Sequence, residues 1–274
     1  MTVARHPITG EPILRAPARA LRPRAFDGAA IERCPFCPGH EADTPPELLR
    51  VGEPWAIRVV PNKYPPAKGA EVVIESPLHE ATFEAIANPE RVVQIYVERH
   101  RAHADAAHVA LFKNEGERAG ASIPHLHSQL VPLHFVPPRI EREIEGFERA
   151  SRCPLCRPDG ALIRESEHFL WLVPSPSPMP WQQWIVPRRH VSGIASFTDA
   201  EVADLASLLQ ASSRAMRRIA ASYNWLFQDF RGARAAHAYI ELFPRLTGIA
   251  GLELGSGTFV EIIDPDAAAE RLRN

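Results

Sequence analysis

Short apolar runs that end in proline-rich loops recur along the chain and predict β-strands. Two of these runs, WAIRVVPNKYP (55–65) and HFLWLVPSPSP (168–178), have the same character, and one lies in each half of the chain. Further strands are predicted in each half, and their segments are EVVIESPLH, HVALFKN, WQQWIVPRRH and NWLFQDF.

Apolar residues at helical spacing predict one long helix in each half. The first helix runs from Pro89 to about Ala107, with Asn88 as its cap and a proline at the first helical position. The second begins after Thr198, and Glu201 stands where a capping box requires an acidic residue. The final segment DPDAAAERLRN predicts a short capped helix, and residues 132–152 predict a proline-rich connector with a charged short helix.

The composition is typical of a soluble globular protein, since 45% of the 274 residues are hydrophobic and 23% are charged. The formal net charge of -2 gives no basic field for nucleic acid or for an anionic membrane, so we expect neither partner. No apolar run approaches the roughly 20 residues that span a bilayer. The N-terminus MTVARHPITG lacks the apolar core of a secretory signal, and we therefore expect a cytoplasmic location.

The four cysteines form two C-P-x-C pairs. In a reducing compartment such pairs are more often zinc ligands than redox centres, and neither pair opens a helix as a redox motif would. Each pair is followed by two histidines, and the two sets are Cys34, Cys37, His79 and His125, and Cys153, Cys156, His190 and His237. We predict a structural zinc site from each set, although Arg189 brings positive charge close to the second.

The spacing of these ligands indicates a duplicated unit. From the first cysteine to the first histidine the separation is 45 residues in one half and 37 in the other, and between the histidines it is 46 and 47. The predicted fold class is therefore α+β, with antiparallel strands, one long helix and one zinc site in each half. We place the two halves at residues 1–135 and 136–274.

The stretch GASIPHLHSQL (120–130) carries two histidines and a glutamine at alternate positions. In a strand, this alternation places His125, His127 and Gln129 on one face. A neutral imidazole with one ring nitrogen donating to a backbone carbonyl keeps its other lone pair available for attack on phosphorus. With His125 as a zinc ligand, His127 is the candidate nucleophile and Gln129 the amide donor to a phosphoryl oxygen. This pattern predicts phosphoryl or nucleotidyl transfer through a covalent histidine intermediate.

The same stretch closely resembles the active-site strand of the galactose-1-phosphate uridylyltransferase family, a branch of the histidine-triad superfamily in which glutamine replaces the third histidine. The family pattern His-Pro-His-x-Gln differs here only at its proline, which is Leu126. The similarity extends over nearly the whole chain. It implies two histidine-triad-like units, a catalytic N-terminal half and a C-terminal half that is structural and contacts the sugar.

The resemblance also implies substrate-binding residues in other segments. PARALRPR (17–24) is similar to the family's arginine segment, VVPNKYP to its nucleoside loop, and FKNEGERAGAS to its phosphate-binding segment. HAYIELFPRLTGIAGLELGSG is similar to the C-terminal strand and hexose-side loop. The implied residues are Arg19 and Arg22 for the phosphates, Asn62, Lys63 and Tyr64 for the nucleoside, Asn114 and Ser122 for the phosphates, and Glu253 for a sugar hydroxyl.

By this resemblance the reaction is a ping-pong nucleotidyl transfer. His127 attacks the α-phosphorus of a nucleoside-diphosphate sugar, the sugar 1-phosphate leaves, and a second hexose 1-phosphate collects the nucleotide. The leading interpretation is a hexose-1-phosphate uridylyltransferase of carbohydrate or galactose metabolism that moves UMP from a UDP-sugar such as UDP-glucose.

The family's site lies between two subunits, which implies a homodimer. The second half reads His237-Ala-Tyr239, so it lacks a nucleophile.

Two alternatives use the same residues. A phosphorylase of nucleoside-diphosphate sugars or dinucleotides, of the ADP-glucose type, or a hydrolase, would resolve the same intermediate with inorganic phosphate or water. A zinc-stabilised nucleotide-binding protein without turnover is an alternative of another class. That alternative would be favoured if His127 were absent or if residue 129 were apolar, and neither is the case.

Overall fold

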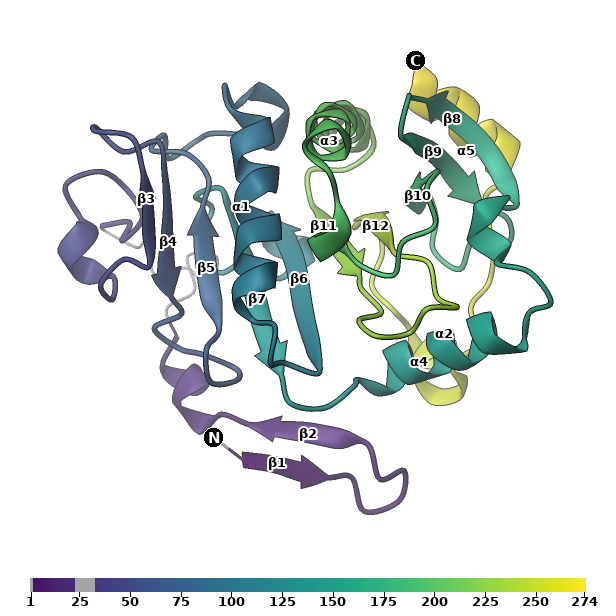
Figure 1. Cartoon of the computed structure of the whole chain (residues 1–274), viewed down its shortest axis with the longest axis horizontal. Coiled ribbons are helices and arrows are strands. Elements are labelled where there is room, and N and C mark those ends of the chain that lie inside the picture. The colour runs from purple at the N-terminus through teal and green to yellow at the C-terminus, as the bar shows by residue number, and fades with distance from the viewer. Residues whose placement is uncertain (1, 23–32) are drawn as a thin grey trace.

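The computed structural model describes residues 2–22 and 33–274. Its main feature is a ten-stranded antiparallel sheet with the strand order β3-β4-β5-β7-β6-β11-β12-β10-β9-β8 (Figure 1). The strands are β3 (Leu49–Val51), β4 (Ile57–Pro61), β5 (Glu71–Ile74), β6 (His108–Glu115), β7 (His127–Leu133), β8 (Gly160–Glu165), β9 (Phe169–Pro174), β10 (Gln183–Pro187), β11 (Tyr223–Gln228) and β12 (Tyr239–Pro244). A separate hairpin of β1 (Thr2–Arg5) and β2 (Pro12–Arg15) lies beside this sheet.

The two halves of the chain meet where β6 pairs with β11. Counted outward from this seam, each half contributes five strands in the same relative order, β6-β7-β5-β4-β3 on one side and β11-β12-β10-β9-β8 on the other. This arrangement agrees with the duplication indicated by the ligand spacing. The division of the chain into two domains at residue 135 remains a prediction, since the sheet continues without interruption across the seam.

Helices α1 and α3 lie side by side across one face of the sheet (Figure 1). The α-helices are α1 (Pro89–Ala102), α2 (Pro138–Arg149), α3 (Asp199–Ile219), α4 (Gly251–Ser256) and α5 (Pro265–Arg273). The short 3₁₀ helices are 17–21, 41–43, 83–85, 117–119, 154–156 and 194–196. The predicted α+β class is thus confirmed, and no helix in the described residues is both long and apolar enough to cross a bilayer.

Local sequence signals account for several helix ends. The Thr198 side chain accepts from the Glu201 amide at the start of α3, and the Glu201 carboxylate accepts from the Thr198 amide, so the predicted capping box is present. Asn88 caps α1 without a side-chain hydrogen bond. That helix ends at Ala102, a few residues before the predicted end. The Asp264 side chain caps the predicted last helix.

The largest core lies between the sheet and helices α1 and α3. Alternate residues of the strands face it, and Leu126 and Leu130 are among them. The predicted alternation therefore holds, because His127 and Gln129 lie on the opposite face of β7. Their side chains are directed away from α1, into a region bounded by residues 33–45 and 60–64.

Candidate functional site

The first set of predicted metal ligands comes together beside the start of β7. The ligand atoms of Cys34, Cys37, His79 and His125 all lie within 4.8 Å of one another. The Sγ–Nδ1 distances are 3.3 Å from Cys37 to His79, 3.6 Å from Cys37 to His125 and 3.7 Å from Cys34 to His125. A tetrahedral zinc ion would hold sulfur and nitrogen about 3.5 Å apart, so this donor set fits a metal ion. His125 Nε2 donates to the Ser76 carbonyl (2.7 Å), which directs Nδ1 toward the metal position.

The second set forms an equivalent cluster beside β12. Cys153, Cys156, His190 and His237 also have their ligand atoms within 4.8 Å of one another. The Sγ–Nδ1 distances are 3.4 Å from Cys156 to His190, and 3.5 and 3.8 Å from Cys153 and Cys156 to His237. His237 Nε2 donates to the Pro187 carbonyl (2.9 Å), as His125 does to its own carbonyl partner. Both donor sets therefore have the chemistry and the spacing of a structural metal site.

The arginine next to this second cluster does not place an unbalanced charge on it. Arg189 forms an ion pair with Glu201 at 2.7 Å, and a second nitrogen of its guanidinium donates to the same carboxylate at 2.8 Å. A carboxylate paired in this way balances most of the positive charge. Glu201, the acidic residue of the α3 capping box, therefore neutralises the arginine that lies next to the second set of predicted metal ligands.

His127 is held in one tautomer. Its Nδ1 donates to the carbonyl oxygen of His125 at 2.8 Å, so Nε2 carries the lone pair of the neutral ring. The residue is only 5% exposed. Burial lowers the pKa of His127 to about 4, and the ring is therefore neutral at pH 7. The Phe36 ring packs edge-on against it, with 5.4 Å between the ring centroids.

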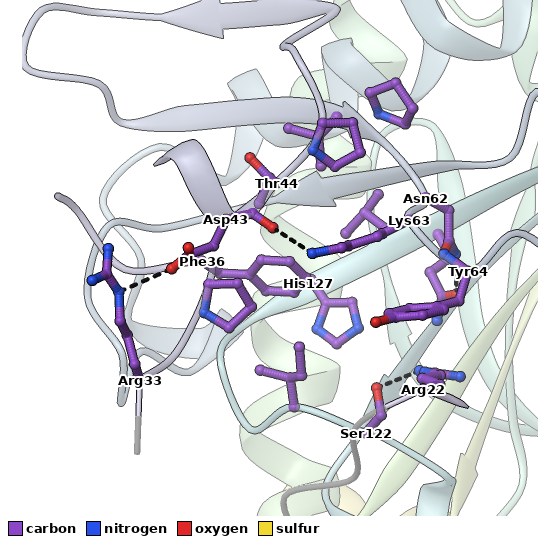
Figure 2. A pocket seen from close by; sticks show the side chains of 17 residues that line it. Arg22, Arg33, Phe36, Asp43, Thr44, Asn62, Lys63, Tyr64, Ser122 and His127 are labelled. Carbon is purple, nitrogen blue, oxygen red and sulfur yellow. Dashed lines mark hydrogen bonds and ion pairs between the residues drawn. The ribbon is translucent and has the colours of Figure 1, made fainter. Parts of the chain in front are cut away.

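A cavity of about 280 Å³ lies over this histidine (Figure 2). Its volume is near the lower end of typical small-molecule sites. Seven predicted site residues line it: Arg22, Asn62, Lys63, Tyr64, Ser122, His127 and Gln129. Among the described residues, the cavity is lined by three cationic side chains, from Arg22, Arg33 and Lys63, and by one carboxylate, Asp43, which pairs with Arg33 at 2.9 Å. The remaining positive charge suits an anionic ligand.

Hydrogen bonds connect the predicted residues around the cavity. Arg22 donates to the Ser122 hydroxyl, and the Asn62 amide donates to Gln129 Oε1 at 3.4 Å. Arg19 does not line the cavity but donates to the Tyr64 carbonyl at 2.6 Å, behind the cavity wall. The last two residues of the arginine segment, 23 and 24, lie outside the described residues.

Besides Arg19, two predicted substrate-binding residues are not among those lining the cavity. Asn114 lies on β6, and its side-chain oxygen accepts from the Asn224 amide at 2.8 Å. Glu253 lies on α4, where its carboxylate accepts from the Ala250 amide at 3.0 Å. Their substrate contacts remain predictions.

Some residues that line the cavity were not predicted. Phe36 lies between the two cysteines of the first pair, so its proximity to the metal cluster could have been read from the sequence. Asp43 and Thr44 belong to no motif. Their place in the site comes from the path of residues 33–45 over the sheet, and no sequence pattern indicated this path.

Comparison with known proteins gives consistent matches over the whole chain. A family model, "Galactose-1-phosphate uridyl transferase, N-terminal domain", matches residues 62–137. The ADP-glucose phosphorylase of Arabidopsis thaliana is 29% identical, over 97% of this chain and 91% of that protein. The galactose-1-phosphate uridylyltransferase of Thermotoga maritima is 26% identical, over 100% of this chain and 98% of that protein. A crystal structure of the Arabidopsis thaliana ADP-glucose phosphorylase with bound ADP-glucose has a TM-score of 0.82, with 28% identity and coverage of 99% of this chain and 98% of that one.

The fold and the site together define an enzyme of a nucleotidyl-transfer family. A duplicated sheet carries a neutral histidine under a cavity suited to anions, and the similar proteins are enzymes. Over nearly its whole length the chain is similar to enzymes of this kind, and residues 62–137 match the model of the galactose-1-phosphate uridyl transferase N-terminal domain.

Proposed function

We propose that this chain transfers a nucleoside monophosphate from a nucleoside-diphosphate sugar through a covalent intermediate on His127. One observation carries the proposal: the ring of His127 is neutral, lines the cavity, and has its lone pair assigned to Nε2 by the Nδ1 hydrogen bond. A nucleophile needs this combination of an available lone pair and a fixed orientation.

The first step exchanges one bond for another. Nε2 of His127 forms a bond to the α-phosphorus, and the bond from that phosphorus to the bridging oxygen breaks. The electron pair of the broken bond leaves with the sugar 1-phosphate. The proton stays on Nδ1, where it is donated to the His125 carbonyl oxygen, and the partial negative charge of that oxygen stabilises the positive charge that develops on the ring.

The neighbouring side chains supply charge stabilisation. Because Gln129 Oε1 accepts from Asn62, the Nε2 protons of Gln129 are the groups it can offer to a phosphoryl oxygen. Arg22 and Ser122 lie together at the cavity wall, where they suit the negative charge of the phosphates. Lys63 donates to the Asp43 carbonyl at 3.3 Å, and this contact holds the expected nucleoside loop against the opposite wall.

The acceptor distinguishes two candidate functions. The leading one is a uridylyltransferase, in which UMP passes from a UDP-sugar to a hexose 1-phosphate. The second is an ADP-glucose-type phosphorylase, in which inorganic phosphate collects AMP. It is favoured by the nearly full-length match to the Arabidopsis thaliana ADP-glucose phosphorylase and to its structure with bound ADP-glucose.

The proposal includes zinc in both Cys₂His₂ clusters, a homodimer and a cytoplasmic location. Zinc is supported by the sulfur and nitrogen donors at tetrahedral spacing. The homodimer rests on the family resemblance, in which the site lies between subunits. We propose that Glu253, which is not among the residues lining this cavity, contacts the sugar from such a partner. Light scattering on the purified protein would measure the mass of the assembly.

Covalent labelling tests the proposal directly. We expect the protein to take an acid-labile radiolabel from UDP-glucose or ADP-glucose carrying ³²P at the α-position. His127→Asn should lose the label, whereas Tyr239→Phe, the matched change on β12, should keep it. Removal of a covalent nucleophile costs on the order of 10³-fold or more in rate.

The labelled protein then identifies the acceptor. Transfer of the label from the uridylylated protein to a hexose 1-phosphate, with formation of a UDP-sugar, supports the uridylyltransferase. Transfer from the adenylylated protein to inorganic phosphate, with formation of ADP, supports the phosphorylase. Absence of label with every nucleotide sugar, or full labelling of His127→Asn, would refute the covalent mechanism.

A further inference from the structure

A group of buried polar side chains lies under β7, on the face of the sheet that α1 covers. Lys113 of β6 and Glu75 form an ion pair at 2.5 Å, and both side chains are 0% exposed. Tyr96 of α1 and Ser128 of β7 donate to the other oxygen of the same carboxylate. All the polar atoms of these four side chains therefore have partners within the protein.

Lys113 also contacts the backbone of the proposed nucleophile. Its Nζ donates to the carbonyl oxygen of His127 at 3.2 Å. The paired positions of β6 and β7 end at Lys113 and Ser128, one residue before His127. The lysine thus holds the carbonyl of His127 where the pairing with β6 stops, from the face opposite the cavity, while Ile74 of β5 still pairs with His127 on the other edge of the strand.

The second half shows that the fold does not require this ion pair. Counted from the metal-binding histidine of each strand, Ser128 on β7 corresponds to Ile240 on β12. The residue paired with Ser128 is Lys113, whereas the residue paired with Ile240 is Phe227. The second half therefore fills the same place with apolar side chains, which both belong to the large core.

A gain in folding stability does not explain why this ion pair is buried. The desolvation of two buried charges is about as costly as their attraction is favourable, and apolar replacements of similar volume are often neutral or stabilising. Pairing with Glu75 makes the burial of this lysine possible, but the pair as a whole brings little net stability, so its presence needs another explanation. The explanation must apply to the half of the chain that carries His127, because that half alone of the two has the ion pair at this place.

We propose that Lys113, neutralised by Glu75, is a positioning residue for His127. It fixes the backbone of the nucleophile, and the ring then keeps its alignment through the Nδ1 bond to the His125 carbonyl. This inference rests on the proposed function. Displacement of a reacting group by about 1 Å can cost roughly 10²-fold in rate, so a hydrogen bond to the nucleophile's own carbonyl has a measurable effect on the chemical step.

The test compares single-turnover labelling in variants of this pair. Lys113→Met alone leaves the Glu75 carboxylate buried without its cation, and this variant can fail by unfolding. The decisive variant is therefore Lys113→Met combined with Glu75→Gln, which is neutral and keeps an acceptor for Tyr96 and Ser128. The matched control is Arg99→Met combined with Glu71→Gln, an ion pair at 2.6 Å between α1 and the other end of β5.

We expect the decisive variant to keep its cooperative thermal unfolding and its metal content. At saturating nucleotide sugar its labelling rate should fall about tenfold or more, while the half-saturating concentration changes by less than about threefold. The control variant should label at the wild-type rate. A merely structural pair would not give a slower chemical step in a protein that folds and binds normally.

Three results would overturn the inference. The first is a folded decisive variant that labels within about twofold of the wild-type rate. The second is a control variant that is slowed equally. The third is a wild-type protein that takes no label, and this result differs from the other two because it also removes the proposed function.

Discussion

Strands β7 and β12 occupy matching places in the two halves of the sheet, but their outer faces have different neighbours. On β7, His127 and Gln129 line a cavity. On β12, the corresponding residues are Tyr239 and Glu241, and helix α2 covers them. Tyr239 donates to Glu143 of this helix at 3.2 Å.

On β12 the buried carboxylate of Glu241 is satisfied by neighbouring side chains. Glu241 accepts from Arg139 of α2, from Gln182 Nε2 at 2.9 Å and from Gln228 Nε2 at 2.7 Å. An apolar cluster that includes Ile140 of α2 packs on the same face. One fold thus supports both a cavity for a ligand and a closed structural face, and the difference lies in whether a helix occupies the outer surface of the histidine-bearing strand.

Loss of one metal ligand from each half is the strongest test of this contrast. Cys34→Ser and Cys153→Ser should each lower the metal content by one ion per chain and the free energy of unfolding by about 3 kcal/mol or more, because structural metal binding contributes folding free energy. At a temperature where both remain folded, Cys34→Ser should also slow labelling, since His125 adjoins His127. Cys153→Ser should label normally.

Elemental analysis and denaturant titration measure the first two quantities. Equal loss of labelling in both variants would show that the second half is not merely structural. Unchanged metal content in both would show that the clusters hold no ion.

The next largest expected change in unfolding free energy comes from breaking the ion pair between α2 and β12. Arg139→Met leaves the buried Glu241 carboxylate without its cation, and we expect a loss of about 2 to 4 kcal/mol in unfolding free energy. Burial already raises the pKa of Glu241, which shows the cost of its charge. Addition of Glu241→Gln should restore most of the stability, as measured by urea titration. A single variant as stable as the wild type would mean that α2 is not held on the sheet by this pair.

The smallest expected change concerns the pH dependence of stability, and it comes from Glu115, a carboxylate at the seam between the halves. Burial raises the pKa of Glu115, which is paired with Tyr223 across the seam, to about 7. The folded state therefore holds this proton more tightly than the unfolded state, and the resulting stability is present below pH 4.5 and is lost as the pH rises to about 7.

The neutral variant Glu115→Gln should remove this loss. Relative to the wild type, its unfolding free energy should rise by about 2 to 3 kcal/mol between pH 4.5 and pH 8. Urea titrations at several pH values give the comparison. Parallel stability curves for the two proteins would show that the carboxylate is not the cause.

Much of the architecture followed from local patterns in the sequence. The alternation in GASIPHLHSQL put His127 and Leu126 on opposite faces, and Leu126 indeed lies in the core under α1. The capping box at Thr198 formed as predicted because its hydrogen bonds join residues three apart. The similar spacing of the ligands in the two halves predicted two clusters, and both are present.

Other features could not be read from any local pattern. The contact of Arg22 with Ser122 joins residues 100 positions apart, and the cover of β12 by α2 depends on where the connector crosses the sheet. A lysine at a core-facing position of β6 was a signal that could have been noticed, since Lys113 alternates with Val109 and Leu111. Its partner Glu75 could not have been named without the strand order.

The sequence by itself determined which side chains share a face of each strand, because this follows from the fixed geometry of a strand. The repeated spacing of cysteines and histidines determined which residues form the two sets that could hold a metal ion. The tertiary structure alone decided that the face of β7 is a cavity, that the face of β12 is closed, and that a buried lysine meets the carbonyl of His127. These outcomes depend on contacts between distant segments, whose relative positions are set by packing of the whole core.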